Sequence, residues 1–348
     1  MKVSIIIPAY NVQSEISRCL KSMINQVYKN IEIIVVDDAS TDNTRSIIKK
    51  YAEKDNRIIP FYQTINKGVS AARNTGLMAA TGDYIMFVDS DDEMIPSAIR
   101  RLVDVANKYN SDFVDSYLLF EYTKPNGKIV HFTENKVPKN TLVMGNIKDN
   151  PKIVKMSTYV TGKLIKKNLF DGITFDEDLR CYEDMVVGNK IKSKLNNYVF
   201  LNRVLYIYHQ RPNSLVNSLG KNHLCFIEAA KMVKEIYSSY DKEIKDEVEA
   251  VLVSNMFLTL ITKVIKNDDT VENNVILATE FLKEIVELFP KYQDNNKINN
   301  IIKKYIVKFI DDKSKLEKFI RKTKKINFIN LYFTYLSIIH KYEIKSSL

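Results

Sequence analysis

Runs of apolar residues alternate with amphipathic segments through the first 95 residues of the chain. The runs are rich in β-branched residues and bounded by turn signals, as in strands buried on both faces, and they span residues 3–11, 31–40, 58–64 and 83–92. Apolar residues recur at helical spacing in the segments between them, at residues 14–27, 41–55 and 68–82. This alternation predicts an α/β fold with a Rossmann-like, mostly parallel sheet flanked by helices.

The pattern changes after Asp112. Residues 113–123 and 128–133 flank the turn sequence KPNG, and this arrangement predicts an antiparallel hairpin. From about Lys221 the periodicity is helical. We therefore expect two domains, an α/β domain at residues 1–219 and an α-helical C-terminal domain at residues 220–348.

Three predicted strands end in polar motifs, PAYN, DDAS and DSDD. Ligands of parallel sheets bind at the carboxyl ends of the strands, so these motifs should converge on one crevice. In DSDD, Asp89 and Asp91 flank a single residue, which lets two carboxylates approach one Mg²⁺ or Mn²⁺ ion together with substrate phosphates. The alternative is that Ser90, Asp91 or Asp92 caps the helix expected near Pro96.

Composition is that of a folded globular protein, with 348 residues, 45% hydrophobic and 27% charged. The net charge is +10, but residues 297–348 alone contain 13 Lys and Arg against four Asp and Glu. The rest of the chain is therefore nearly neutral, which argues against a nucleic-acid-binding face. No apolar run reaches 18 residues and the first residues do not resemble a signal peptide, so we expect a cytoplasmic protein.

The three cysteines, Cys19, Cys181 and Cys225, are scattered and have neither metal-type nor redox-type spacing. We interpret them as packing residues of a protein from a reducing compartment. Neither GxxxxGK[ST] nor GxGxxG occurs, which excludes a P-loop ATPase and a dinucleotide-dependent oxidoreductase. Paired acids in DDAS also occur in receiver domains, but the later-strand lysine and the short body of that class are missing.

The ordered set VSIIIPAYNV, IEIIVVDDASTDNT, NKGVSAARNTGLMAATGDYIMFVDSDD closely resembles the nucleotide-binding half of family 2 glycosyltransferases. The resemblance covers residues 3–95 almost continuously and continues more thinly through GKLIKKNLF, FDEDLRCYEDM and YHQRPNSLV. It implies a GT-A fold, a nucleotide-sugar-binding half at residues 1–95, an acceptor half at 96–219, and transfer with inversion at the anomeric carbon.

The resemblance also implies residue roles on the donor side. Five residues match positions that hold the nucleotide base and ribose: Pro8, Tyr10, Asp38, Asn66 and Arg73. Asp89 and Asp91 match the metal and diphosphate motif, with Asp91 the direct ligand and Mn²⁺ or Mg²⁺ the cofactor.

On the acceptor side, Asp184 matches the general base, and Glu183 the neighbour that orients acceptor or donor. An alternative role for this acidic pair is to open the following helix and complement its dipole, and both roles can coexist. Arg211 and Ser214 could close over the diphosphate, and His209 could be an additional metal ligand.

By resemblance, the donor is a UDP-sugar, and the acceptor a hydroxyl of a surface polysaccharide, a teichoic-acid-type polymer or a glycolipid. A non-catalytic sugar-nucleotide or polysaccharide-binding protein and a sugar-1-phosphate nucleotidyltransferase are the alternatives. The basic tail has two interpretations. It rests on the inner face of the cell membrane through amphipathic helices, or it packs on the catalytic body or on a second subunit.

Overall fold

The computed structural model describes residues 1–123, 129–133, 143–156, 159–179, 181–210, 225–261 and 269–324. The strands are β1 (Val3–Ala9), β2 (Ile31–Asp37), β3 (Ile58–Tyr62), β4 (Tyr84–Phe87), β5 (Glu93–Met94), β6 (Phe113–Thr123), β7 (Ile129–Thr133), β8 (Val143–Gly145), β9 (Leu164–Lys166) and β10 (Tyr198–Gln210). The helices of the first part are α1 (Ile16–Ile24), α2 (Thr44–Ala52), α3 (Val69–Ala79), α4 (Ala98–Tyr109) and α5 (Glu183–Lys194), with 3₁₀ turns at Pro151–Lys155 and Lys167–Phe170. Those of the last part are α6 (Cys225–Ile236), α7 (Lys242–Thr259), α8 (Val271–Leu288), α9 (Asn300–Asp311) and α10 (Lys313–Lys324).

All ten strands form one sheet, in which β3, β2, β1, β4, β9, β6, β10 and β5 follow one another. The four strands predicted within the first 95 residues pair in parallel. Beyond them the sheet is mixed: β9 is antiparallel to β4 and β6, whereas β10 is parallel to β6. The hairpin predicted after Asp112 is present, since β7 is antiparallel to the end of β6.

The apolar runs of β1 and β2 are continuous because helices cover both faces of the sheet. Every residue of β1 is buried, and its side chains alternate between two apolar clusters. Ile5 packs on the face that α1, α2 and α4 cover, and Ile6 on the face that α3 covers. This packing fixes the position of the strand ends, where the polar motifs lie.

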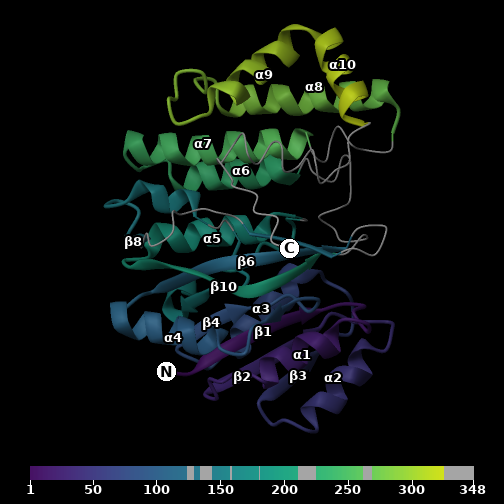
Figure 1. Cartoon of the computed structure of the whole chain (residues 1–348), viewed down its shortest axis with the longest axis vertical. Coiled ribbons are helices and arrows are strands. Elements are labelled where there is room, and N and C mark those ends of the chain that lie inside the picture. Colours follow the sequence, from purple (N-terminus) through teal and green to yellow (C-terminus); the bar gives the residue numbers. More distant parts are fainter. Residues whose placement is uncertain are drawn as a thin grey trace.

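The helical part stacks on the same side of the sheet as α5 (Figure 1). Going away from the sheet, α6 and α7 follow α5, then α8, and then α9 with α10 at the end of the molecule's long axis. One apolar cluster runs from Ile6 in β1 to Ile320 in α10. The helices therefore share a core with the sheet. The expected domain boundary near residue 219 lies outside the described residues.

The first half of the basic tail packs inwards. Ile302, Ile306 and Phe309 of α9 and Leu316 and Ile320 of α10 are fully buried. This agrees with the packing interpretation for residues 300–324, while residues 325–348 are outside the described part. Among the described helices, none is both long and apolar enough to cross a membrane.

Cys181 and Cys225 form a disulfide, with their Cα atoms 6.0 Å apart, and Cys19 is free and buried. Our interpretation of all three cysteines as packing residues was therefore wrong for two of them. They are 44 residues apart, and the fold brings the segment before α5 against the first residue of α6.

Candidate active site

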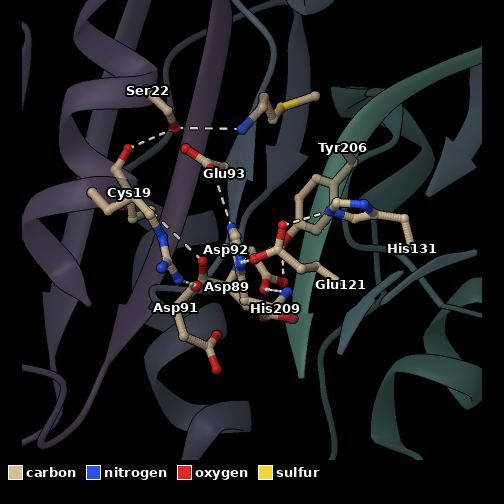
Figure 2. A network of polar contacts seen from close by, with 12 residues as sticks. Cys19, Ser22, Asp89, Asp91, Asp92, Glu93, Glu121, His131, Tyr206 and His209 are labelled. Carbon is tan, nitrogen blue, oxygen red and sulfur yellow. Dashed lines mark hydrogen bonds and ion pairs between the residues drawn. The ribbon is translucent and has the colours of Figure 1, made fainter. Parts of the chain in front are cut away.

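The acidic turn between β4 and β5 gives its three aspartates different surroundings (Figure 2). Asp92 is fully buried, and its carboxylate accepts hydrogen bonds from the Tyr206 hydroxyl at 2.6 Å and the backbone N–H of His209 at 2.9 Å. Burial, with the charges of Asp91 and Asp89 adding to it, raises the pKa of Asp92 well above its usual value. Asp92 therefore holds the turn in place.

Asp89 and Asp91 are more open than Asp92. The side chain of Asp89 is 31% exposed, and that of Asp91 extends away from the Asp92 carboxylate (Figure 2). The backbone carbonyl of Asp91 accepts a hydrogen bond from Arg18 of α1. Helix α4 takes Ser97 as its N-cap residue. The alternative in which the aspartates cap that helix is therefore not realised.

Arg73 of α3 connects the acidic turn to the start of α5. Its guanidinium donates to Asp89 at 3.2 Å and to Glu183 at 2.6 Å, and it stacks over the Phe175 ring. Arg73 is only 5% exposed. Burial lowers the pKa of Arg73, but the charges of Asp89, Glu183 and Asp184 outweigh this effect and the net shift is upwards. The cation is thus fixed between two motifs that lie 94 positions apart in the sequence.

Glu183 and Asp184 occupy the first turn of α5, where carboxylates complement the helix dipole. Tyr182 precedes them in the left-handed region, with φ of 62°. Asp184 accepts a hydrogen bond from the N–H of Met185 at 2.7 Å. Burial and the neighbouring Glu183 charge raise the pKa of Asp184 to about 7, against the opposing charge of Arg73. A carboxylate with this pKa can accept a proton near neutral pH.

His209 of β10 lies in a chain of side chains beside the turn (Figure 2). Its Nδ1 is 3.0 Å from Glu121 and its Nε2 is 2.9 Å from Glu93, while His131 lies 2.8 Å from the other Glu121 oxygen. Both ring nitrogens of His209 therefore face carboxylates. The predicted role of His209 as a metal ligand would require it to break one of these contacts.

The residues expected to hold base and ribose lie around the carboxyl ends of β1 and β2. Tyr10 is 45% exposed and Asn66 is exposed, whereas Pro8 is buried in β1. Asp38 is buried and accepts the backbone N–H groups of Lys67 at 2.9 Å and Gly68 at 2.8 Å.

Asp38 thus shapes the loop that leads into α3, while Arg73 points to the carboxylates described above. Arg211 and Ser214 lie outside the described residues.

A divalent cation fits the carboxylates of the acidic turn by ligand chemistry. Carboxylate oxygens are the ligands that Mg²⁺ and Mn²⁺ prefer, and one or two of them commonly suffice when phosphates complete the site. Among the residues that the structure describes, no group of three or more His, Cys, Asp and Glu is arranged to hold a metal ion. By ligand chemistry alone, a pair of carboxylates such as Asp89 and Asp91 fits a cation whose other ligands are phosphates.

Several residues that the motifs did not reveal complete the site. Tyr206 supports the acidic turn, Thr161 lies 3.4 Å from Asp89, and Glu93 and Glu121 hold His209. They come from separate strands and loops, and all but Glu93 lie beyond residue 95. The sequence contains one indication of these contacts. Three aspartates lie close together after β4, and such like charges need hydrogen-bond donors or a cation nearby.

The chain is similar to known glycosyltransferases in sequence and in fold. Residues 4–162 match the model of glycosyl transferase family 2. Glycosyltransferase GlyA of Streptococcus pneumoniae serotype 4 is 35% identical over 221 residues, which cover 62% of this chain and 31% of GlyA. The minor teichoic acid biosynthesis protein GgaB of Bacillus subtilis strain 168 is 27% identical over 301 residues, covering 84% of this chain and 32% of GgaB. The chain spans about a third of the length of these two relatives.

Among solved structures, S. aureus TarS 1–349 in complex with UDP-GlcNAc superposes with a TM-score of 0.68. The match covers 99% of this chain and 93% of that chain at 21% identity. At this level of identity the comparison establishes a shared fold.

Proposed function

Because residues 4–162 match glycosyl transferase family 2 and the chain has a GT-A-like fold, we propose that it is a member of that family and moves a sugar from a UDP-sugar to an acceptor hydroxyl with inversion. The proposal rests on the pair of ion pairs that Arg73 forms with Asp89 and Glu183, which we call the Arg73 bridge. It holds the acidic turn and the start of α5 together, so that a diphosphate-binding motif and a carboxylate with a pKa of about 7 border one site.

In the proposed reaction, the acceptor oxygen attacks the anomeric carbon as the bond from that carbon to the diphosphate oxygen breaks. The leaving UDP takes the bonding electron pair, and Asp184 takes the proton of the acceptor hydroxyl. Attack opposite to the leaving group inverts the anomeric configuration. Glu183, held by Arg73, helps to maintain the raised pKa of Asp184.

Asp89 and Asp91 would hold Mn²⁺ or Mg²⁺, and a bound cation would supply positive charge against the negative charge of the departing diphosphate. Arg73 and Asp92 would not contact the cation but position the two carboxylates. Arg73 donates a hydrogen bond to one oxygen of Asp89, and Asp92 fixes the turn by accepting a hydrogen bond from Tyr206.

For the acceptor, we propose a hydroxyl of a teichoic-acid-type polymer. The name of GgaB supports this class, and the matched region covers 84% of the present chain. The UDP-GlcNAc bound to the structurally similar TarS supports a uridine nucleotide on the donor side.

Titration calorimetry with UDP, with and without Mn²⁺, tests the donor site. We expect binding that depends on Mn²⁺ and is lost in Asp91→Asn. The control is Asp104→Asn, which removes an exposed carboxylate from α4 and should leave binding unchanged. Equal binding by both variants would exclude the assignment of Asp91. UDP binding without transfer to any acceptor, or without hydrolysis of UDP-sugars, would favour the non-catalytic alternative.

A further inference from the structure

Four lysines surround a hollow of about 540 Å³ on α9 and α10, which we call the lysine hollow. It is lined by Gln293, Lys303, Lys304, Val307, Lys308, Asp311 and Lys315. Among the described residues that line it, Asp311 is the acidic one. Over both helices, nine Lys and Arg stand against two Asp and Glu. Positive charges gathered around a concave surface raise the local concentration of anions.

Within the described part of the chain, the contacts of these lysines compensate little of their positive charge. Lys303 donates to the backbone carbonyl of Gln293 at 2.7 Å, and Lys308 lies over the Tyr305 ring. Neither partner carries a negative charge. Lys315 is paired with Asp312 at 2.9 Å, but its side chain is 53% exposed. Lys304 and Lys308 are both exposed.

The form of the site favours a soluble chain of phosphates over a membrane surface. Binding in the plane of a bilayer needs an apolar face beside the lysines. The apolar residues of α9 and α10 are instead used in the core, and Ile301 is the large hydrophobic residue of these two helices that is substantially exposed. A hollow lined by ammonium groups matches tetrahedral phosphate groups, which present several acceptor oxygens each.

The position of the hollow favours a long ligand. Helices α6, α7 and α8 lie between α5 and the α9–α10 pair (Figure 1). With packed helices spaced about 10 Å apart, the hollow is roughly 20–30 Å from the start of the acceptor site. A short saccharide could not reach both places, whereas a polymer could. Simultaneous contact would raise the effective concentration of the acceptor hydroxyl.

We infer that the lysine hollow binds the repeated phosphate groups of an anionic acceptor polymer while another part of that polymer occupies the catalytic site. This inference rests on the proposed function for the identity of the polymer as acceptor. The binding of phosphate chains itself depends only on α9 and α10.

Inorganic polyphosphate is a suitable probe, used with the full chain in binding titrations. The double variant Lys304→Gln/Lys308→Gln should bind it roughly tenfold more weakly, since each lysine near an anionic surface contributes a factor of several. The matched control is Lys242→Gln/Lys245→Gln, which removes the same charge from exposed positions of α7. Polyphosphate binding that falls equally in both double variants would overturn the inference.

Two further arms test the ligand class. Poly-glutamate, a polyanion without phosphate, should compete more weakly than polyphosphate, and equal competition would reduce the hollow to unspecific charge attraction. In the second arm, the protein is sedimented with vesicles of phosphatidylglycerol. We expect no sedimentation that depends on Lys304 and Lys308. If the unchanged protein sediments with the vesicles and Lys304→Gln/Lys308→Gln does not, the ligand is a membrane and the inference is wrong.

UDP calorimetry on the same variants separates this inference from the proposed function. Both double variants should bind UDP like the unchanged protein. Polyphosphate binding at the hollow without any UDP binding would contradict the proposed function alone. UDP binding without a selective loss in Lys304→Gln/Lys308→Gln would contradict the inference alone.

Discussion

The hydroxyl group of Tyr206 joins two aspartates of the acidic turn. It donates a hydrogen bond to the carboxylate of Asp92 at 2.6 Å and accepts one from the backbone N–H of Asp89 at 3.1 Å. Tyr206 and Asp92 are fully buried. A single hydroxyl on β10 therefore fixes the geometry of the motif that we assign to the donor.

Tyr206→Phe tests this relationship. The substitution leaves the Asp89 N–H and one Asp92 oxygen without their partner, and we expect a loss of about 2–3 kcal/mol in the free energy of unfolding. Because the turn is no longer held, Mn²⁺-dependent UDP binding should weaken as well. Urea unfolding and calorimetry measure the two effects. Tyr51→Phe on α2 is the control, and a similar loss of UDP binding in both variants would contradict a specific role for Tyr206.

Gly162 makes room for the Tyr206 ring. A Cβ at this position would lie 2.8 Å from the ring, and φ is +72°. Gly172 has nearly the same φ, +71°, with nothing near an added Cβ. Gly172→Ala should therefore show the cost of the left-handed backbone, about 1–2 kcal/mol, and Gly162→Ala that cost plus about 1–3 kcal/mol for overpacking. Thermal or urea unfolding measures both losses of stability. Equal losses in the two variants would mean that the Tyr206 ring moves aside at no cost in free energy.

The pKa of Asp184 predicts the pH dependence of transfer. A base with a pKa of about 7 is protonated below that pH, so kcat/KM should fall about tenfold per unit below pH 7 and level off above it. Glu183→Gln removes the like charge that helps to raise this pKa. Its acidic limb should therefore shift to lower pH, although burial keeps the pKa of Asp184 above that of an ordinary aspartate.

Glu177→Gln is the control for that profile, because it neutralises an exposed carboxylate that contacts Asn74 rather than Asp184. Its acidic limb should stay near pH 7. An unchanged limb in Glu183→Gln would show that the titrating base is not coupled to Glu183, and Asp184 would lose its assignment.

The strand and helix order of the first 95 residues follows from local patterns, because parallel strands buried on both faces produce continuous apolar runs. The polar residues at their ends, such as Asp38 and Asp89, then fall at one edge of the sheet. The partners of these residues could not be predicted in the same way. Asp92 meets Tyr206 across 114 positions.

That pairing depends on the register of β10 against β6, which shifts between Leu201 and Tyr206. No local pattern encodes such a shift. The disulfide between Cys181 and Cys225 was missed for a related reason, since it depends on how α6 docks against α5. The family resemblance implied a base- or ribose-binding role for Asp38 after β2, but its use of both oxygens to fix the loop before α3 depends on the conformation of that loop.

Arg73→Met should combine a large loss of stability with a shift in the pH profile opposite to that of Glu183→Gln. It leaves the carboxylates of Asp89 and Glu183 without their shared cation, which costs about 3–5 kcal/mol for a buried pair. Arg73 lowers the pKa of Asp184, so its removal should move the acidic limb above pH 7. Urea unfolding and kcat/KM against pH measure both effects.

Arg73→Lys keeps the positive charge and should cost less stability than Arg73→Met, so it separates the effect of charge from that of geometry. A lysine ammonium carries the same charge but cannot span two carboxylates with a planar fork. We expect the acidic limb to remain near pH 7, because the charge is kept, while kcat and Mn²⁺-dependent UDP binding fall together. If Arg73→Lys instead retained full activity, Arg73 would act only through its charge, and the bridge between the acidic turn and α5 would not be needed for positioning.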